Sequence, residues 1–289
     1  MKICPTCNHH FSQSAWICPV CNYTPPLLSN HFAFASDLAN ANDGFESHFF
    51  STLALCEAKN FWFRSRNRLI LWALRTYFKR SQDFLEIGCG TGFVLQAIEK
   101  NMPHLKLSGS EIFSAGLEFA QSRLVRTSLF QMDARQIPFA EEFDVIGAFD
   151  VLEHINEDQL VLTQIYQSLR HGGGIILTVP QHSWLWSQAD DYAHHVRRYS
   201  QQELCLKLKQ AGFEIVKTTS FVSLLLPLML LSRLSQRNKS QNYDPLTEFR
   251  ISKFLNFFLE KILGFERLFV KLGCTFPLGG SLLVIAYKK

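Results

Sequence analysis

The sequence predicts an α/β fold, a seven-stranded and mostly parallel sheet flanked by helices. After Asp83, short apolar runs alternate with amphipathic stretches, which is typical of strand–helix units around a parallel sheet. A glycine-rich turn joins the first of these runs to a helical stretch, as expected at a strand-to-helix turn that binds a ligand. The seven strands are expected at residues 84–87, 105–109, 129–132, 143–149, 174–179, 213–218 and 282–287.

Composition divides the 289 residues into three parts. Residues 1–24 contain four of the eight cysteines and form a separate unit. Residues 25–44 start with Pro25-Pro26 and are rich in Asn, Ser and Ala, so we expect a linker there. Residues 45–289 form the main domain, with a mostly helical insertion expected at about residues 221–274, before the last strand.

Local signals mark the ends of two helices in the main domain. Asn156 with Gln159, and Ser200 with Glu203, have the spacing of a capping box. We therefore expect helices to begin at these positions, and Gly212 to end the second one.

The N-terminal unit carries two C-P-x-C turns separated by ten residues. Four thiolates at this spacing are typical of a closed structural zinc site, and about twenty residues are too few to fold without a metal. Because four sulfurs leave no open coordination position, catalytic zinc is not expected. We predict a zinc ribbon whose ligands are Cys4, Cys7, Cys18 and Cys21.

Net charge and hydropathy limit the partners and the cellular compartment that we expect for this protein. The net charge of +4 comes from basic residues spread along the chain, so nucleic-acid binding is permitted but not indicated. The N-terminus has no apolar signal segment, so we expect a cytoplasmic protein without disulfides.

The longest apolar stretch is interrupted by Ser223 and Pro227 and is shorter than the roughly 20 residues that span a bilayer. Residues 221–233, with Arg237 and Lys239 after them, favour peripheral contact with the inner face of the membrane, or with an apolar substrate, over a buried cap.

The most informative segment is the turn from Gly88 to Gly92. Glycines at alternate positions allow the backbone to turn sharply and to approach a ligand at a helix N-terminus. The dinucleotide fingerprint requires its third glycine at position 93, where this chain has Phe93. Glu86, two residues before the first glycine, would repel a pyrophosphate. Both features argue against a nicotinamide-dependent reductase.

From Glu86 to Gly92 the chain resembles the first motif of the class I S-adenosylmethionine-dependent methyltransferases, of the type 11/12 group, which is an acidic residue followed by G-x-G-x-G. The resemblance continues in order to Pro180 and implies a Rossmann-like sheet that binds S-adenosylmethionine. Glu86 would face the ammonium of the methionyl group, Glu111 the ribose hydroxyls and Asp133 the adenine amino group. The residues implied to line the cofactor are Glu86, Gly88, Cys89, Gly90, Thr91, Gly92, Glu111, Ile112, Met132, Asp133, Ala134, Phe149 and Asp150.

Helical spacing before the first strand predicts one or two helices over residues 45–79. The resemblance implies that such a helix covers the methionyl end of the cofactor with Trp62 and Arg66. The alternative is an amphipathic helix packed on the sheet edge.

Methyl transfer mainly requires positioning of the acceptor, but a hydroxyl or carbon acid needs a base, for which histidine is suited. The histidines in the expected position are His154, His182, His194 and His195, and of these His195 and His154 are the candidate bases. A His-x-Arg-x-Tyr segment resembles methyltransferases that act on lipids, quinones or glycans, and the expected substrate loop comprises His182, Trp184, Arg197 and Tyr199. An alternative of equal weight is that Asp190 or Asp191 pairs with Arg197 or Arg198 to fix the loop, with His195 only hydrogen-bonded.

The expected function is methyl transfer to an O, N or C atom of a small molecule, lipid-, quinone- or glycan-related. One alternative is a ribosomal or transfer RNA methyltransferase that uses its zinc ribbon to bind RNA, although the weak basic bias argues against it. A different class of alternative is a non-catalytic interaction protein.

Overall fold

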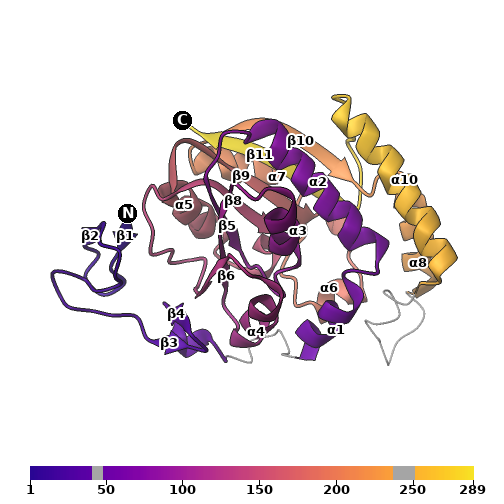
Figure 1. The fold of residues 1–289 in the computed structure, drawn as a ribbon. Coiled ribbons are helices and arrows are strands. Elements are labelled where there is room, and N and C mark those ends of the chain that lie inside the picture. The colour runs from indigo at the N-terminus through magenta and orange to yellow at the C-terminus, as the bar shows by residue number, and fades with distance from the viewer. Residues whose placement is uncertain (41–47, 237–250) are drawn as a thin grey trace.

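The computed structural model describes residues 1–40, 48–236 and 251–289, and it is built around one central sheet (Figure 1). The strand order is β10-β11-β9-β8-β5-β6-β7-β4-β3. Neighbours from β9 to β4 pair in parallel, while β11 runs antiparallel to both β9 and β10, and β3 is antiparallel to β4. All seven expected strands are present, as β5 (Asp83–Ile87), β6 (Lys106–Glu111), β7 (Ser128–Gln131), β8 (Phe143–Phe149), β9 (Leu169–Pro180), β10 (Phe213–Phe221) and β11 (Ser281–Lys288).

The expected count of seven strands is wrong, because the main sheet has nine strands in the described residues alone. The two additional strands, β3 (Leu27–Leu28) and β4 (His31–Ala33), come from the segment expected to be a linker. They are held by Gln131, whose side-chain amide bonds the backbone N–H and C=O of Ala35 at 3.0 and 2.8 Å. Strands of two and three residues are too short to leave an alternating pattern in the sequence. Residues 41–44 of the expected linker lie outside the described residues.

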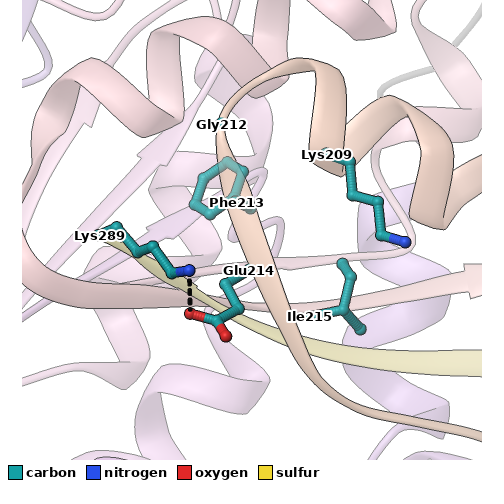
Figure 2. Close-up of a pocket in the computed structure, with 6 residues that line it drawn as sticks. All are labelled: Lys209, Gly212, Phe213, Glu214, Ile215 and Lys289. Carbon is teal, nitrogen blue, oxygen red and sulfur yellow. Dashed lines mark ion pairs between the residues drawn. The ribbon is translucent and has the colours of Figure 1, made fainter.

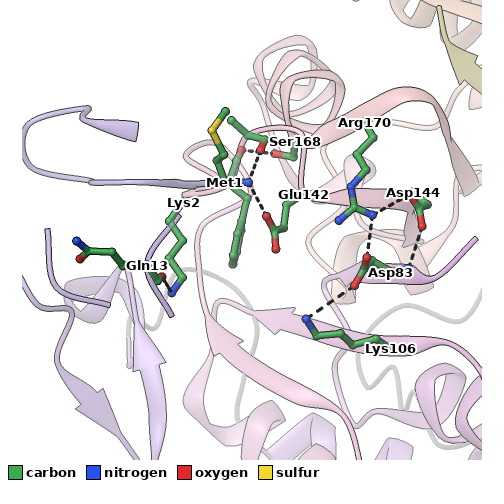
Figure 3. Close-up of polar contacts among 11 residues, drawn as sticks. Met1, Lys2, Gln13, Asp83, Lys106, Glu142, Asp144, Ser168 and Arg170 are labelled. Carbon is green, nitrogen blue, oxygen red and sulfur yellow. Dashed lines mark hydrogen bonds and ion pairs between the residues drawn. The ribbon is translucent and has the colours of Figure 1, made fainter. Parts of the chain in front are cut away.

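The N-terminal unit packs directly on this edge of the sheet. Besides β1 (Lys2–Ile3) and β2 (His10–Phe11), it contributes Trp16, whose ring lies 4.5 Å from Phe34 and 5.5 Å from Phe139, centroid to centroid. The amino group of Met1 donates to the carbonyl of Ala140 at 2.7 Å and pairs with Glu142 (Figure 3). The unit therefore shares one hydrophobic core with the main sheet.

Helices cover both faces of the sheet and form two core clusters. On one face lie α2 (Phe61–Tyr77), α3 (Phe93–Asn101), α4 (Ser114–Arg123) and α10 (Lys253–Lys271), and on the other α5 (Asp158–Ser168) and α7 (Gln201–Gln210). The remaining described helices are α1 (His48–Cys56), α6 (Gln188–Tyr192), α8 (Leu226–Gln236), and the short η1 (Ser36–Leu38), η2 (Leu152–His154) and η3 (Ser183–Leu185). In the expected insertion, α8 and α10 are helical, and residues 237–250 lie outside the described part. Among the described helices, none combines the length and apolarity needed to cross a membrane.

Of the two expected capping boxes, the one at Ser200 forms its N-cap bond. The hydroxyl of Ser200 accepts from the N–H of Glu203 at 3.1 Å, and Gly212, with φ at 100°, follows the end of α7. The expectation at Asn156 is wrong, because α5 begins at Asp158 with Glu157 as its N-cap and no side-chain cap. Asn156 instead offers its carbonyl to the guanidinium of Arg197, so a tertiary contact outweighs the local signal.

We expect Trp16→Ala to lower the free energy of unfolding by about 3–5 kcal/mol, because it empties the centre of the aromatic cluster that joins the N-terminal unit to the sheet. Trp184→Ala is the matched control: its ring is 55% exposed, so its loss should change the free energy by about 0.5 kcal/mol or less. Urea unfolding followed by circular dichroism measures both. Equal losses in the two variants would contradict the shared core.

Candidate functional site

The glycine turn lies between the end of β5 and the start of α3. Gly88, Gly90 and Gly92 all have positive φ, at 65°, 52° and 74°. A side chain at position 88 would place its Cβ 2.6 Å from a methyl group of Val151, so only glycine fits there. At Gly90 the nearest atom to such a Cβ is 3.8 Å away, on the ring of Phe50. The backbone at Gly90 is therefore the part of the turn that a ligand can approach.

Glu86 lies at the end of β5 and is buried, with no hydrogen-bond partner for its Oε2 in the described structure. Burial raises the pKa of this carboxyl well above its usual value; Arg66 opposes the shift, and Glu111 and Glu57 add to it. A buried polar atom without a partner costs free energy unless a ligand satisfies it. The donor that fits here is an ammonium group, which is what a methionyl moiety carries.

Glu111, at the end of β6, is held by three backbone amides. Its Oε2 accepts from Gly90 at 2.9 Å, and its Oε1 accepts from Ile112 at 2.8 Å and from Phe113 at 3.2 Å. Burial raises the pKa of the carboxyl, while these N–H groups act in the opposite direction. Three of about four acceptor positions are used, so one remains for a hydroxyl beside the turn.

Asp133 follows β7 and is already engaged. Both of its oxygens contact the guanidinium of Arg135, at 2.8–3.1 Å, and Oδ1 also accepts from the N–H of Arg135 at 2.8 Å. Contact with an adenine amino group would have to displace Arg135, so the adenine role stays a prediction. Its neighbours Met132 and Ala134 are buried, as is Cys89, whose side chain belongs to the core beneath the turn.

Sequence reasoning missed three residues that surround the turn. The ring of Phe50, on α1, lies 2.9 Å from where a Cβ at Gly116 would be, and it is buried. The hydroxyl of Thr91 donates to Glu57 at 2.7 Å, and Arg123 bonds both of them at 2.8 Å. No motif spacing marks Phe50, Glu57 or Arg123, because helices on either side of the turn bring them together.

Asp150 and Arg66 join the end of β8 to helix α2. Asp150 has φ at 59°, donates its N–H to the carbonyl of Thr178 at 2.8 Å and forms an ion pair with Arg66. The guanidinium of Arg66 lies 4.6 Å from the ring centroid of Trp62. Phe149, just before Asp150, is buried. Helix α2 therefore reaches the carboxyl edge of the sheet, where parallel-sheet proteins bind their ligands.

The two candidate bases lie together, with the ring centroids of His154 and His195 4.7 Å apart. His195 Nδ1 bonds Asp190 at 2.8 Å, and Arg198 contacts the same carboxylate at 2.7 and 3.0 Å. Burial opposes ionisation of Asp190, but these bonds hold its pKa well below the usual range. Burial, with repulsion from His195, lowers the pKa of His154 to about 3. The contacts of Asp190 match the loop-fixing alternative.

The expected substrate loop divides into two groups. Trp184 is exposed and stacks on His182 at 4.9 Å. Tyr199 is completely buried and donates its hydroxyl to Asp158 at 2.8 Å, and Arg197 pairs with the same carboxylate. The structure thus separates Arg197 and Tyr199, which face the start of α5, from His182 and Trp184.

The four N-terminal cysteines form one cluster. Their Sγ atoms lie within 4.8 Å of one another, with Cys4–Cys21 and Cys7–Cys18 both at 3.5 Å. Sulfurs on one tetrahedral zinc ion lie about 3.8 Å apart, so the donor set can hold a metal. The two turns repeat the same backbone bonds, and each ends in an asparagine with φ at 57°, Asn8 and Asn22.

A shallow pocket elsewhere on the surface is lined by residues from the end of α7 and the start of β10 (Figure 2). Glu214 and Lys289 form an ion pair there at 3.2 Å. Because β10 is parallel to β9, this pocket lies at the edge of the sheet opposite the glycine turn. It holds none of the predicted site residues.

Comparison with known proteins identifies this arrangement. A family model described as a methyltransferase domain matches residues 57–218, more than half of the chain. The chain belongs to the methyltransferase domain family. This domain contains the glycine turn, Glu86, Glu111 and the two histidines.

Individual relatives of this methyltransferase domain are distant. A probable S-adenosylmethionine-dependent methyltransferase of Mycolicibacterium smegmatis is 24% identical over 163 residues, covering 55% of this chain and 62% of the relative. The demethylmenaquinone methyltransferase of Thermotoga maritima is 28% identical over 97 residues, covering 33% and 42%. The chain thus spans less than two thirds of these relatives. Phosphoethanolamine N-methyltransferase 2 of Haemonchus contortus, solved with S-adenosyl-L-methionine, shares the fold, with a TM-score of 0.57 at 16% identity over 86% of this chain and 58% of that one.

Proposed function

We propose that this protein is an S-adenosylmethionine-dependent methyltransferase that acts on an O, N or C atom of a small molecule. The buried Oε2 of Glu86 beside the glycine turn, which has no hydrogen-bond partner among the described residues, carries the proposal, since it matches the ammonium of the cofactor. Membership of the methyltransferase domain family supports it.

Each residue around the turn has a distinct part in the proposed reaction. When bound, the cofactor would supply a methyl group already activated by its sulfonium. Glu86 would hold the ammonium, Glu111 would accept from a ribose hydroxyl, and the backbone at Gly90 would allow close approach. Phe50 from α1 and Arg66 from α2 would exclude water on the open side. Positioning and exclusion of water are the main requirements of methyl transfer.

The acceptor is proposed to be apolar, of the lipid or quinone kind, and reached from a membrane surface. Helix α10 leaves a row of apolar side chains exposed, with Phe254 at 82%. We call this row the α10 face; it comprises Phe254, Leu255, Phe257, Phe258, Phe265, Leu268 and Leu272. Leu228 and Leu231 of α8 add to the exposed apolar surface of the insertion. The relative named for demethylmenaquinone supports an acceptor of this kind.

The charges on α10 favour an anionic bilayer as the occupant of this face. Lys253, Lys261 and Lys271 are exposed on the helix. Both acids of α10 turn inward, since Glu260 pairs with Arg64 and Arg68, and Glu266 accepts from the backbone of Ser223 and Leu224. A cationic, Phe-rich helix surface is what binds anionic lipid. The flanking Arg237 and Lys239 lie outside the described residues.

An RNA acceptor is less favoured, because the aromatic side chains of the N-terminal unit are used within the protein. Trp16 and Phe11 are buried, and the ammonium of Lys2 donates to the carbonyls of Gln13 and Ser14 (Figure 3). The unit therefore has few groups left to stack on bases. We propose instead that it is a structural zinc ribbon over residues 1–24, ahead of the methyltransferase domain.

Binding of the cofactor is tested by calorimetric titration of the wild type and of Glu86→Gln with S-adenosylmethionine. The substitution keeps the shape but removes the charge, and loss of a charge-assisted hydrogen bond of about 1.5–3 kcal/mol weakens binding about 10- to 100-fold. Glu118→Gln, an exposed glutamate on α4, is the control and should bind like the wild type. Titration with NADH should give no heat. If the folded wild type does not bind S-adenosylmethionine, the enzyme proposal fails and a non-catalytic interaction protein is favoured.

Zinc content tests the ribbon. Protein grown with zinc should carry one tightly held ion per chain, and Cys18→Ser should lose it, because removal of one thiolate opens the closed site. The midpoint of thermal unfolding should fall in the same variant, since metal binding contributes folding free energy. Cys274→Ser changes an exposed cysteine outside the cluster and should alter neither value. Full zinc content in Cys18→Ser would refute the assignment.

Sedimentation with vesicles tests the α10 face. The wild type should bind vesicles that contain phosphatidylglycerol and not vesicles of phosphatidylcholine alone. Phe254→Ser with Phe257→Ser should weaken binding about tenfold or more, because two large apolar groups no longer enter the lipid. Val125→Ser with Leu206→Ser removes equally exposed apolar groups elsewhere and is the control. Equal loss in both double variants, or no binding by the wild type, would exclude docking through α10.

A further inference from the structure

A second buried carboxylate, that of Glu153, lies beside both histidines. Glu153 is fully buried in η2, and neither of its oxygens has a hydrogen-bond partner within the described part of the chain. One ligand atom from each of Glu153, His154 and His195 lies within 4.8 Å of the other two. A buried carboxylate without a hydrogen-bond donor costs free energy, so we expect a bound ligand or ion to satisfy it.

The neighbouring arginines do not satisfy it, because each is bonded to another acid. Arg66 pairs with Asp150, and Arg198 makes a two-point contact with Asp190. Arg233 lies 3.6 Å from Asp190 as well. Glu153 is thus the one acid of this group without an ion pair among the described residues.

The hydrogen bonds of the histidines leave nitrogen lone pairs suited to a metal. His195 uses Nδ1 to bond Asp190, so Nε2 is its other ring nitrogen and carries the lone pair in the neutral ring. His154 donates to the backbone of Ala193. A histidine that ligates a metal commonly bonds a carboxylate or a carbonyl through its second nitrogen, and both arrangements are present here.

We propose that Glu153, His154 and His195 bind a divalent cation at the carboxyl edge of the sheet. Two imidazoles and one carboxylate are a donor set that first-row divalent metals favour. The site follows β8, which pairs with β5 and so lies beside the glycine turn. It is separate from the cysteine cluster, whose thiolates belong to the N-terminal unit.

Three protein ligands leave coordination positions of the cation open for an oxygen of the substrate. The proposed methyl acceptor atom is therefore an oxygen. This part rests on the proposed methyltransferase function. An acceptor hydroxyl on the cation would lose its proton to water more readily. Its oxygen would then bond the methyl carbon, while the carbon–sulfur bond breaks and its electron pair stays on sulfur. Neither His154 nor His195 then needs to act as the base.

Electron paramagnetic resonance of Mn²⁺ tests the site in the full, zinc-loaded chain. Mn²⁺ is a hard cation that four thiolates hold poorly, so it reports on this site and not on the ribbon. The wild type should bind one Mn²⁺ per chain, and Glu153→Gln and His195→Asn should weaken binding about tenfold or more. Glu157→Gln, a half-exposed acid four residues away, and Cys274→Ser should bind as the wild type does.

The outcomes separate this proposal from the function on which it rests. Absence of Mn²⁺ binding by the wild type, or undiminished binding by folded Glu153→Gln and His195→Asn, overturns the cation site whatever the titration with S-adenosylmethionine gives. Binding of Mn²⁺ without binding of S-adenosylmethionine supports the site and overturns the methyltransferase function. Catechol, used as an oxygen-donor probe, should displace water from bound Mn²⁺ and lower the proton relaxation enhancement; no change would overturn the oxygen-acceptor part.

Discussion

The carboxylate of Glu111 joins two loops that the sheet alone would leave separate. Parallel pairing brings the ends of β5 and β6 side by side, with Ile87 opposite Ser110, but the chain beyond each strand is irregular. By accepting from Gly90 on one loop and from Ile112 and Phe113 on the other, Glu111 fixes both in one geometry. The positive φ angles of the glycines are what bring the Gly90 amide within reach. The backbone at Gly90, which faces the ring of Phe50, is held in place by this crosslink.

The acids at this edge of the sheet fall into two kinds, those in ion pairs with arginine and those with a buried oxygen that has no hydrogen-bond partner among the described residues. Asp150, Asp190 and Asp158 each pair with arginine, and they hold α2, the loop after β9 and the start of α5 in place. Within the described part of the chain, Oε2 of Glu86 and both carboxylate oxygens of Glu153 are buried without hydrogen-bond partners. An acid that only served stability would be expected to have a donor, because desolvation without one is unfavourable. Glu86 lies at the end of β5, and Glu153 lies in η2 shortly after the neighbouring strand β8, so both acids are at the same edge of the sheet.

Hydrophobic periodicity predicted the strands that form long, regular segments. It did not predict elements or contacts whose position is set by a single tertiary contact. Strands β8, β9 and β11 match most clearly, because each buries several consecutive apolar residues. Strands β3 and β4 were missed because the side chain of Gln131, about a hundred residues further on, holds them. The motif placed Glu86 and Glu111 at the turn. Nothing in the sequence indicates that the guanidinium of Arg135 bonds the carboxylate of Asp133. In the same way, nothing in the sequence indicates that Tyr199, expected in the substrate loop, is buried and bonds Asp158, which lies 41 residues away.

The N-terminal unit is connected to the cofactor edge through a short series of contacts. Trp16 packs on Phe34, and the backbone N–H of Phe34 donates to the carbonyl of Gln131 at 2.8 Å. The side chain of Gln131 then donates to the carbonyl of Ile112 at 2.9 Å, and the N–H of Ile112 is one of those that hold Glu111. If the N-terminal unit served only to bind a partner protein, it would not need to bury Trp16 in the core that it shares with the main sheet. On the proposal that the four thiolates hold a zinc ion that this unit needs to fold, the geometry of Glu111 would depend in part on that ion at the far edge of the sheet.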